Sequence, residues 1–265
     1  MDSTGLSMDT TTIISAVLEG ILYGFLVLMF IGTIWASTYK QNVNRSIILV
    51  AILLFILSTA HIIVDIIRLE NGFIKYRDTF PGGPAAFFQD ISQPTFFAKN
   101  MIYAFQTMLG DGVLIYRCYV VWQSIGIIII PSLLWCTCSA TTFIANYYAL
   151  QANGGNVFID QTRAWVVAMV ALTLATNLMS SGLLAYRIWM MERKVSAMRA
   201  ASDTLMPIVR VLVDAAIMYS GMLLVMLICF VSDNNAQFII QDMMMPIIPI
   251  AFYMVFVRIT FRNIT

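Results

Sequence analysis

Long apolar runs separated by short polar segments extend along the whole chain. A transmembrane helix needs roughly 20 mostly apolar residues to cross the hydrocarbon core of a bilayer. Seven runs reach that length, at about residues 12–37, 46–67, 96–120, 126–150, 164–189, 211–232 and 238–257. The pattern predicts an all-α membrane protein in which residues 1–265 form one domain, a seven-transmembrane helix bundle.

The composition supports the same fold class. Of the 265 residues 60% are hydrophobic and 11% are charged, and the mean hydropathy is +0.84. A soluble domain carries roughly 25% charged residues, so a water-soluble globule is excluded and membrane lipid is the expected surrounding. The net charge is only +1 and the basic residues are dispersed, which argues against a nucleic-acid partner.

The distribution of lysine and arginine sets the expected orientation. With the N-terminus outside, ten of the 15 basic residues lie on the inner side and five on the outer side. The positive-inside rule therefore predicts an outside N-terminus and a cytoplasmic C-terminus. We expect the plasma membrane, with an endomembrane as the alternative. The basic, amphipathic loop at about 190–210 extends a helix or lies along the inner leaflet, and a cytoplasmic signalling partner could bind there.

Ionisable residues inside the apolar runs are the first place to look for function, because charged groups are costly in a bilayer. Glu19, His61, Asp65 and Asp242 all fall in the predicted outer half, on runs 12–37, 46–67 and 238–257. Together they could line a polar pocket that opens outward between these three helices. Alternatively, each of them reaches the headgroups or pairs with Lys99 or Arg68.

A polar stripe follows run 96–120. Asn100, Tyr103, Thr107 and Asp111 recur at spacings of three and four, so they share one helical face. Asp111 lies near mid-membrane between two glycines, which leave room for another helix or a ligand. The Asp111 carboxyl is expected to be neutral or bonded to a partner such as Asn146, Asn177 or Arg117, and a structural role as an interhelix hydrogen-bond hub is equally open.

Three local features add expectations about packing. The segment 68–94 contains the pair Phe87 and Phe88 and is long enough to be a lid or a disordered loop. Prolines inside the runs, Pro246 and Pro249 among them, should kink helices and free backbone carbonyls for other partners. Gly20-x-x-x-Gly24 predicts close packing of another helix.

Two classes of seven-helix protein are excluded by residue type. A retinal protein needs a lysine within its last helix, and all four lysines, Lys40, Lys75, Lys99 and Lys194, lie at run ends or in loops. A catalytic zinc site of the three-histidine type is impossible with a single histidine, His61. No metal and no cofactor is therefore expected.

The end of run 96–120 carries a recognisable pattern, Gly110-Asp111-x4-Tyr116-Arg117-x-Tyr119-x-Val121-Trp122, and GGPAAFF precedes it at 82–88. These motifs resemble the large family of seven-helix integral membrane proteins of mushroom-forming basidiomycete fungi, which share a G-D-x4-Y-R-x-Y-x-V-W signature. The resemblance covers all seven runs and implies the seven-helix fold. That family is largely uncharacterised, so the resemblance implies no specific activity.

A receptor-like protein that senses a small, unknown ligand in an outer-half polar pocket is the favoured hypothesis. The position of Arg117 and Tyr116 is similar to that of the arginine switch of G-protein-coupled receptors, and Asp214 could hold Arg117 in one state. Arg210 and Asp214 are four apart and suit a structural ion pair. The residues expected to bind the ligand are Glu19, His61, Asp65, Asn100, Tyr103, Thr107, Asp111 and Asp242.

An intramembrane enzyme is the alternative. Membrane-bound terpene cyclases of fungi are also small seven-helix proteins, and they use carboxylic acids to protonate an isoprenoid. The acids that could serve here are Asp111, Asp65, Glu19 and Asp242. An enzyme of that kind needs a largely apolar chamber with an acid in its wall, whereas a receptor needs a pocket open to the outer solution.

Overall fold

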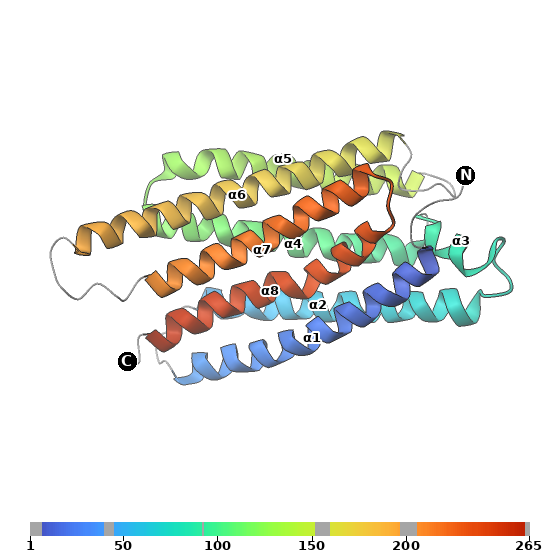
Figure 1. The fold of residues 1–265 in the computed structure, drawn as a ribbon, viewed down its shortest axis with the longest axis horizontal. Helices are drawn as coiled ribbons and strands as arrows, with labels where there is room; N and C mark the ends of the chain where they lie inside the picture. Colours follow the sequence, from blue (N-terminus) through green and yellow to red (C-terminus); the bar gives the residue numbers. More distant parts are fainter. Residues whose placement is uncertain (1–6, 40–44, 92, 152–159, 197–205, 263–265) are drawn as a thin grey trace.

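The computed structural model describes residues 7–39, 45–91, 93–151, 160–196 and 206–262, and these residues form helices and turns without a strand (Figure 1). The helices are α1 (Met8–Tyr39), α2 (Arg45–Glu70), the π-helical turn η1 (Asn71–Lys75), α3 (Gly83–Gln89), α4 (Pro94–Trp122), α5 (Ile125–Gln151), α6 (Asp160–Ser196), α7 (Met206–Val231) and α8 (Ala236–Arg262). Every one of the seven predicted apolar runs lies almost entirely within one of the long helices.

The long helices lie side by side and run alternately along the long axis of the molecule (Figure 1). The short helix α3 lies at one end, which we call the α3 end. Within the described residues, six helices are long and apolar enough to cross a membrane, at Met8–Thr38, Arg45–Lys75, Ile125–Tyr148, Arg163–Met191, Val213–Val231 and Ala236–Arg258. These six spans indicate an integral, multi-pass membrane protein with a helical bundle.

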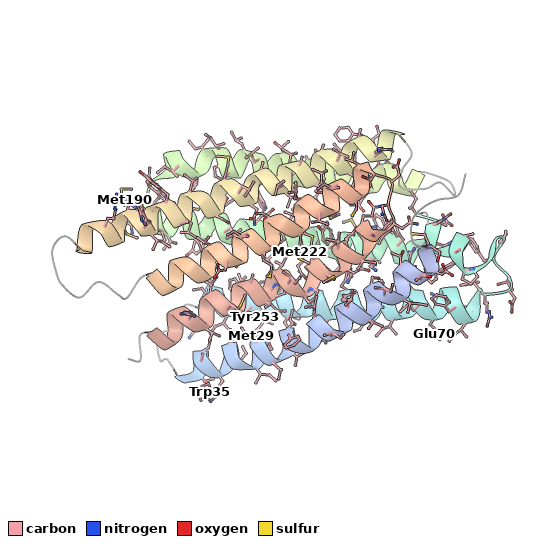
Figure 2. All side chains as sticks on the ribbon, in the orientation of Figure 1. Met29, Trp35, Glu70, Met190, Met222 and Tyr253 are labelled. Atoms are coloured by element: carbon pink, nitrogen blue, oxygen red, sulfur yellow. The ribbon has the colours of Figure 1, made fainter. Side chains whose placement is uncertain are left out.

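Helix α4 is not among the six, and it carries Lys99, Asp111 and Arg117. It packs against α2, α5, α6 and α8, which gives it a central position in the bundle. Large apolar side chains point outward around the bundle, including Leu28, Trp35, Leu133 and Ile217 (Figure 2 labels Trp35). Polar groups therefore gather inside the bundle, as expected where lipid is the surrounding solvent.

Helix α8 continues through both of its prolines. Pro249 has no N–H group, so the carbonyl of Met245, four residues earlier, loses its intrahelical donor. That carbonyl accepts hydrogen bonds from Gln106 Nε2 of α4 and, at 3.3 Å, from Ser58 Oγ of α2. The prediction that the prolines free backbone carbonyls for interior partners is confirmed at this position.

The close packing predicted at Gly20 and Gly24 is wrong. A Cβ atom built at either residue would meet nothing within 4 Å outside its own surroundings in α1. Large apolar residues next to them, Ile21 and Phe25, are exposed on the same helix. At these two positions α1 therefore has no close contact with another described helix, although it packs against α8 and α2 elsewhere.

The segment after α2 folds into a cap over the α3 end. Phe87 and Phe88 of α3 are 2% and 1% exposed, and they pack with Phe73, Phe80 and Met8. Arg68 Nη2 donates to the carbonyl of Phe88 at 2.9 Å. The sequence allowed either a lid or a disordered loop here. The structure describes every residue of the segment except position 92, and the described residues fold against α1 and α2, so the expectation of a disordered loop is wrong for them.

Candidate functional site

Five ionisable residues from four helices meet near the α3 end, and we call them the charge cluster. Lys99 Nζ of α4 donates to Asp242 Oδ2 of α8 at 2.8 Å and also bonds to Asp65 of α2. His61 Nδ1 of α2 lies 2.6 Å from Glu19 Oε1 of α1. None of the five is more than 9% exposed. The cluster therefore ties α1, α2, α4 and α8 together.

The charge cluster is balanced from within the chain. Its three carboxylates contact the ammonium of Lys99 or the imidazole of His61. The guanidinium of Arg68, three residues after Asp65 and 4% exposed, is a second buried cation nearby. One more positive charge or one bound proton completes the balance, and the short contact between His61 and Glu19 provides either. Loss of any one partner would leave an unpaired buried charge, which is very costly, so these groups depend on one another.

The carboxylates of the charge cluster also have the spacing of a cation site. Oxygens of Glu19, Asp65 and Asp242 all lie within 4.8 Å of one another. Lys99 already supplies a positive charge to two of these three groups. The sequence offered pairing with Lys99 as the alternative to an outer pocket, and this pairing is found for Asp65 and Asp242. The cluster therefore carries no argument for a metal ion.

A cavity of about 70 Å³ lies beside the charge cluster, between α4, α5, α6, α7 and α8, and we call it the amide cavity. Four carboxamide side chains line it: Asn100, Asn146, Gln237 and Gln241. Gln241 Nε2 donates to Asn100 Oδ1 at 2.8 Å. Gln237 is only 2% exposed, and neither its oxygen nor its nitrogen has a hydrogen-bond partner among the described residues.

The polar stripe of α4 faces a row of three cavities. Asn100 and Tyr103 line the amide cavity, and Tyr103, Thr107 and Asp111 line a small cavity of about 10 Å³. Asp111 also lines a third cavity, of about 80 Å³, which we call the Asp111 cavity. The prediction of one common face is confirmed, because shared side chains connect each cavity to the next.

Asp111 has no partner in the part of the chain that the structure describes. It is 3% exposed and makes no hydrogen bond or ion pair with a described residue. Asn177 Oδ1 instead accepts from Ser220 at 3.1 Å, and Asn146 Nδ2 donates to the carbonyl of Thr142 at 2.9 Å. The predicted role of Asp111 as a hydrogen-bond hub is therefore not found.

The predicted switch contact is also absent from the described residues. The Arg117 guanidinium lies 4.7 Å from the ring centre of Phe252, in a cation–π contact, and Asp214 is exposed. Tyr116 points outward and is 50% exposed. The side chain of Arg210, and with it the predicted pair with Asp214, lies outside what the structure describes, as do residues 197–205 of the basic loop at 190–210.

The eight predicted ligand-binding residues thus divide into two groups. Glu19, His61, Asp65 and Asp242 bond within the charge cluster, whereas Asn100, Tyr103, Thr107 and Asp111 line cavities. The sequence predicted a pocket between α1, α2 and α8. The cavities that the described residues form instead lie along α4, among α4 to α8, and α2 contributes only Leu54 to the Asp111 cavity.

Sequence reasoning missed Gln237 and Gln241 in the wall of the amide cavity. Their spacing of four places them on one helical face, and this was the signal that could have found them.

Neither a protein-family model, nor a curated protein, nor a solved structure matches this chain.

Proposed function

We propose that this protein is a receptor-like, seven-span membrane protein that binds a small, uncharged polar ligand in the amide cavity. The observation that carries the proposal is the Gln237 side chain, buried in the cavity wall without a partner for either amide atom. Leaving a buried donor or acceptor unpaired costs about 1–3 kcal/mol. A ligand with one acceptor and one donor would remove both costs.

The other polar groups of the cavity argue for an uncharged ligand. Asn100, Tyr103, Thr142, Asn146 and Gln241 carry no charge near neutral pH. Nearby charges belong to the charge cluster, whose acids and bases already face one another. A charged ligand would find no counterion in the wall, while an uncharged polar one would find several hydrogen-bonding groups.

The proposal includes α4 as the seventh span, with the α3 end outside and the C-terminus in the cytoplasm. The support is the central position of α4, where its polar stripe faces other helices and not lipid. The excess of lysine and arginine on the opposite side supports the orientation. This orientation fits a plasma-membrane receptor with a signalling partner at the 190–210 loop.

The cap gives the amide cavity a connection to the outer end. Phe238 lines the cavity and also packs against the cluster formed by Met8 and the cap residues Phe87 and Phe88. Phe96, another wall residue, lies edge-on to Phe238, and the Arg68 guanidinium lies 5.0 Å from the Phe96 ring centre. A ligand in the cavity would therefore touch side chains that the cap also contacts.

Small molecules that co-purify with the protein test this proposal. The unmodified protein, Gln237→Met and the control Gln89→Met are each purified in mild detergent from the native membrane, and bound compounds are identified by mass spectrometry. Gln89 is exposed at the same end of the bundle. We expect a polar compound in the unmodified protein and in the control, reduced about tenfold in Gln237→Met. The same compounds at the same levels in all three would contradict the proposal.

The intramembrane enzyme has less support. Three of its four acids have partners, because Asp65 and Asp242 bond to Lys99 and Glu19 bonds to His61. Asp111 is the acid that faces an apolar cavity. If proteoliposomes cyclise a prenyl diphosphate, and Asp111→Asn abolishes the product, the enzyme replaces the receptor as the better hypothesis.

A further inference from the structure

The chain buries four carboxylates among its described residues, and three of them show how it neutralises such groups. Asp65 and Asp242 share the ammonium of Lys99, and Glu19 lies against His61. Asp111 is the exception, since no basic side chain contacts it in the described residues. Lys99 and Asp111 are twelve positions apart on α4, about 18 Å of helix, so Lys99 cannot serve both places.

The space in front of Asp111 is a cavity with mostly apolar walls. Leu54, Val113, Ile248 and Phe252 contribute apolar groups, and Asn177 contributes an amide. The volume is about 80 Å³. Because a cavity needs only about 10–15 Å³ of such space to hold one water, this one has room for about five groups of that size.

We infer that the Asp111 cavity is a binding site for a small organic ammonium ion, distinct from the amide cavity. The carboxylate would pair with the ammonium, as Asp242 pairs with Lys99, and the apolar walls would hold the hydrocarbon part. Both contacts act on the same molecule, since charge and apolar surface lie side by side in this cavity. The site takes primary amines of about four carbons.

A bare metal ion fits the cavity less well. Hard cations such as magnesium and calcium take six or more oxygen ligands. Apart from Asp111, the wall offers the side-chain oxygens of Asn177, Ser181 and Tyr219, and Asn177 Oδ1 already accepts a hydrogen bond from Ser220. An ammonium needs far fewer oxygen ligands and gains from the apolar wall.

Arg117 is the other charged group in the wall. It follows Asp111 by six positions, about 9 Å of helix rise, and its guanidinium lies over Phe252. The cation site therefore lies at the Asp111 side of the cavity. An anion would instead bind at Arg117, so a test must compare cationic and anionic probes of the same size.

Three probes with the same four-carbon chain make that comparison: butylamine, butanol and butyrate. At neutral pH butylamine is protonated, as a lysine side chain is. The measurement is the thermal unfolding midpoint of the full-length protein in nanodiscs, for the unmodified chain, Asp111→Asn and Gln237→Met. At ten times its dissociation constant, butylamine should raise the midpoint of the unmodified chain by about 3 °C, and butanol and butyrate should not.

The variants separate this site from the amide cavity. Asp111→Asn keeps the shape of the side chain and should abolish the effect of butylamine, whereas Gln237→Met should keep it. Equal effects of butylamine and butanol on the unmodified chain would overturn the inference without reliance on any variant. Stabilisation by butyrate alone would also overturn the inference. So would an effect of sodium chloride that depends on Asp111, if butylamine has no effect.

Discussion

Pro249 determines how three helices meet in the centre of the molecule. The Met245 carbonyl that it frees is bonded by Gln106, which is fully buried and also donates to Ser58 Oγ at 2.9 Å. This junction lies on α4 between Lys99 of the charge cluster and Asp111. The sequence predicts that a carbonyl must be freed, because proline lacks the N–H group. It does not predict the partner, since that depends on which face of α4 meets α8.

Replacing Gln106 with methionine should lower the free energy of unfolding by about 1–3 kcal/mol, because the Met245 carbonyl and Ser58 lose a donor. In a Pro249→Ala background the carbonyl regains an intrahelical donor, so the cost should fall by about 1 kcal/mol. The measurement is unfolding in detergent, followed by circular dichroism, of the unmodified protein, Gln106→Met, Pro249→Ala and the double variant. Together they give the coupling free energy between the two substitutions. Additive effects of the two substitutions would show that Gln106 does not compensate for the proline.

At the scale of helices, apolar length locates every long element. Runs such as 46–67 and 126–150 each lie within one helix, because a span must satisfy its own backbone hydrogen bonds in lipid. The cap is different. Its stability comes from aromatic contacts between η1 and α3, such as Phe73 with Phe88 at 5.0 Å between ring centres. Segment length and an aromatic pair suggest a lid, but they do not fix such contacts.

Gly72 provides a test of the cap. A Cβ atom at this position would collide with the ring of Phe88, which is 1% exposed and bonded through its carbonyl to Arg68. Gly72→Ala should therefore lower the free energy of unfolding by about 1–3 kcal/mol. Gly20→Ala is the matched control, because a Cβ atom at Gly20 in α1 would meet open space. Alanine should be neutral there, or stabilising by about 0.5–1 kcal/mol. Equal effects in denaturant titrations would contradict the close packing of the cap.

Across the whole molecule, the four buried carboxylates of the described residues occupy two levels along α4, one at the charge cluster and one at Asp111. The sequence predicts these levels, because depth follows from position within a span. It cannot predict that Lys99 turns inward to Asp242, since a lysine near a helix end can also extend to the headgroups. With this orientation of Lys99, the residues of the expected outer pocket form a charge cluster, and the cavities lie elsewhere along α4.

The inward position of Lys99 also bears on the number of spans. The charged side chains of α4 are bonded or face cavities, so α4 can cross the bilayer in spite of its polar residues. If α4 is a span, the α3 end and the loop between α4 and α5 lie on opposite sides of the membrane.

Asp78→Cys, in the cap segment, should react with a membrane-impermeant maleimide on intact cells. Ser124→Cys, between α4 and α5, should react only after permeabilisation. Both positions are exposed, and the native cysteines lie within long helices. Labelling of both from one side would mean that α4 does not span the membrane, and the reverse pattern would invert the proposed orientation.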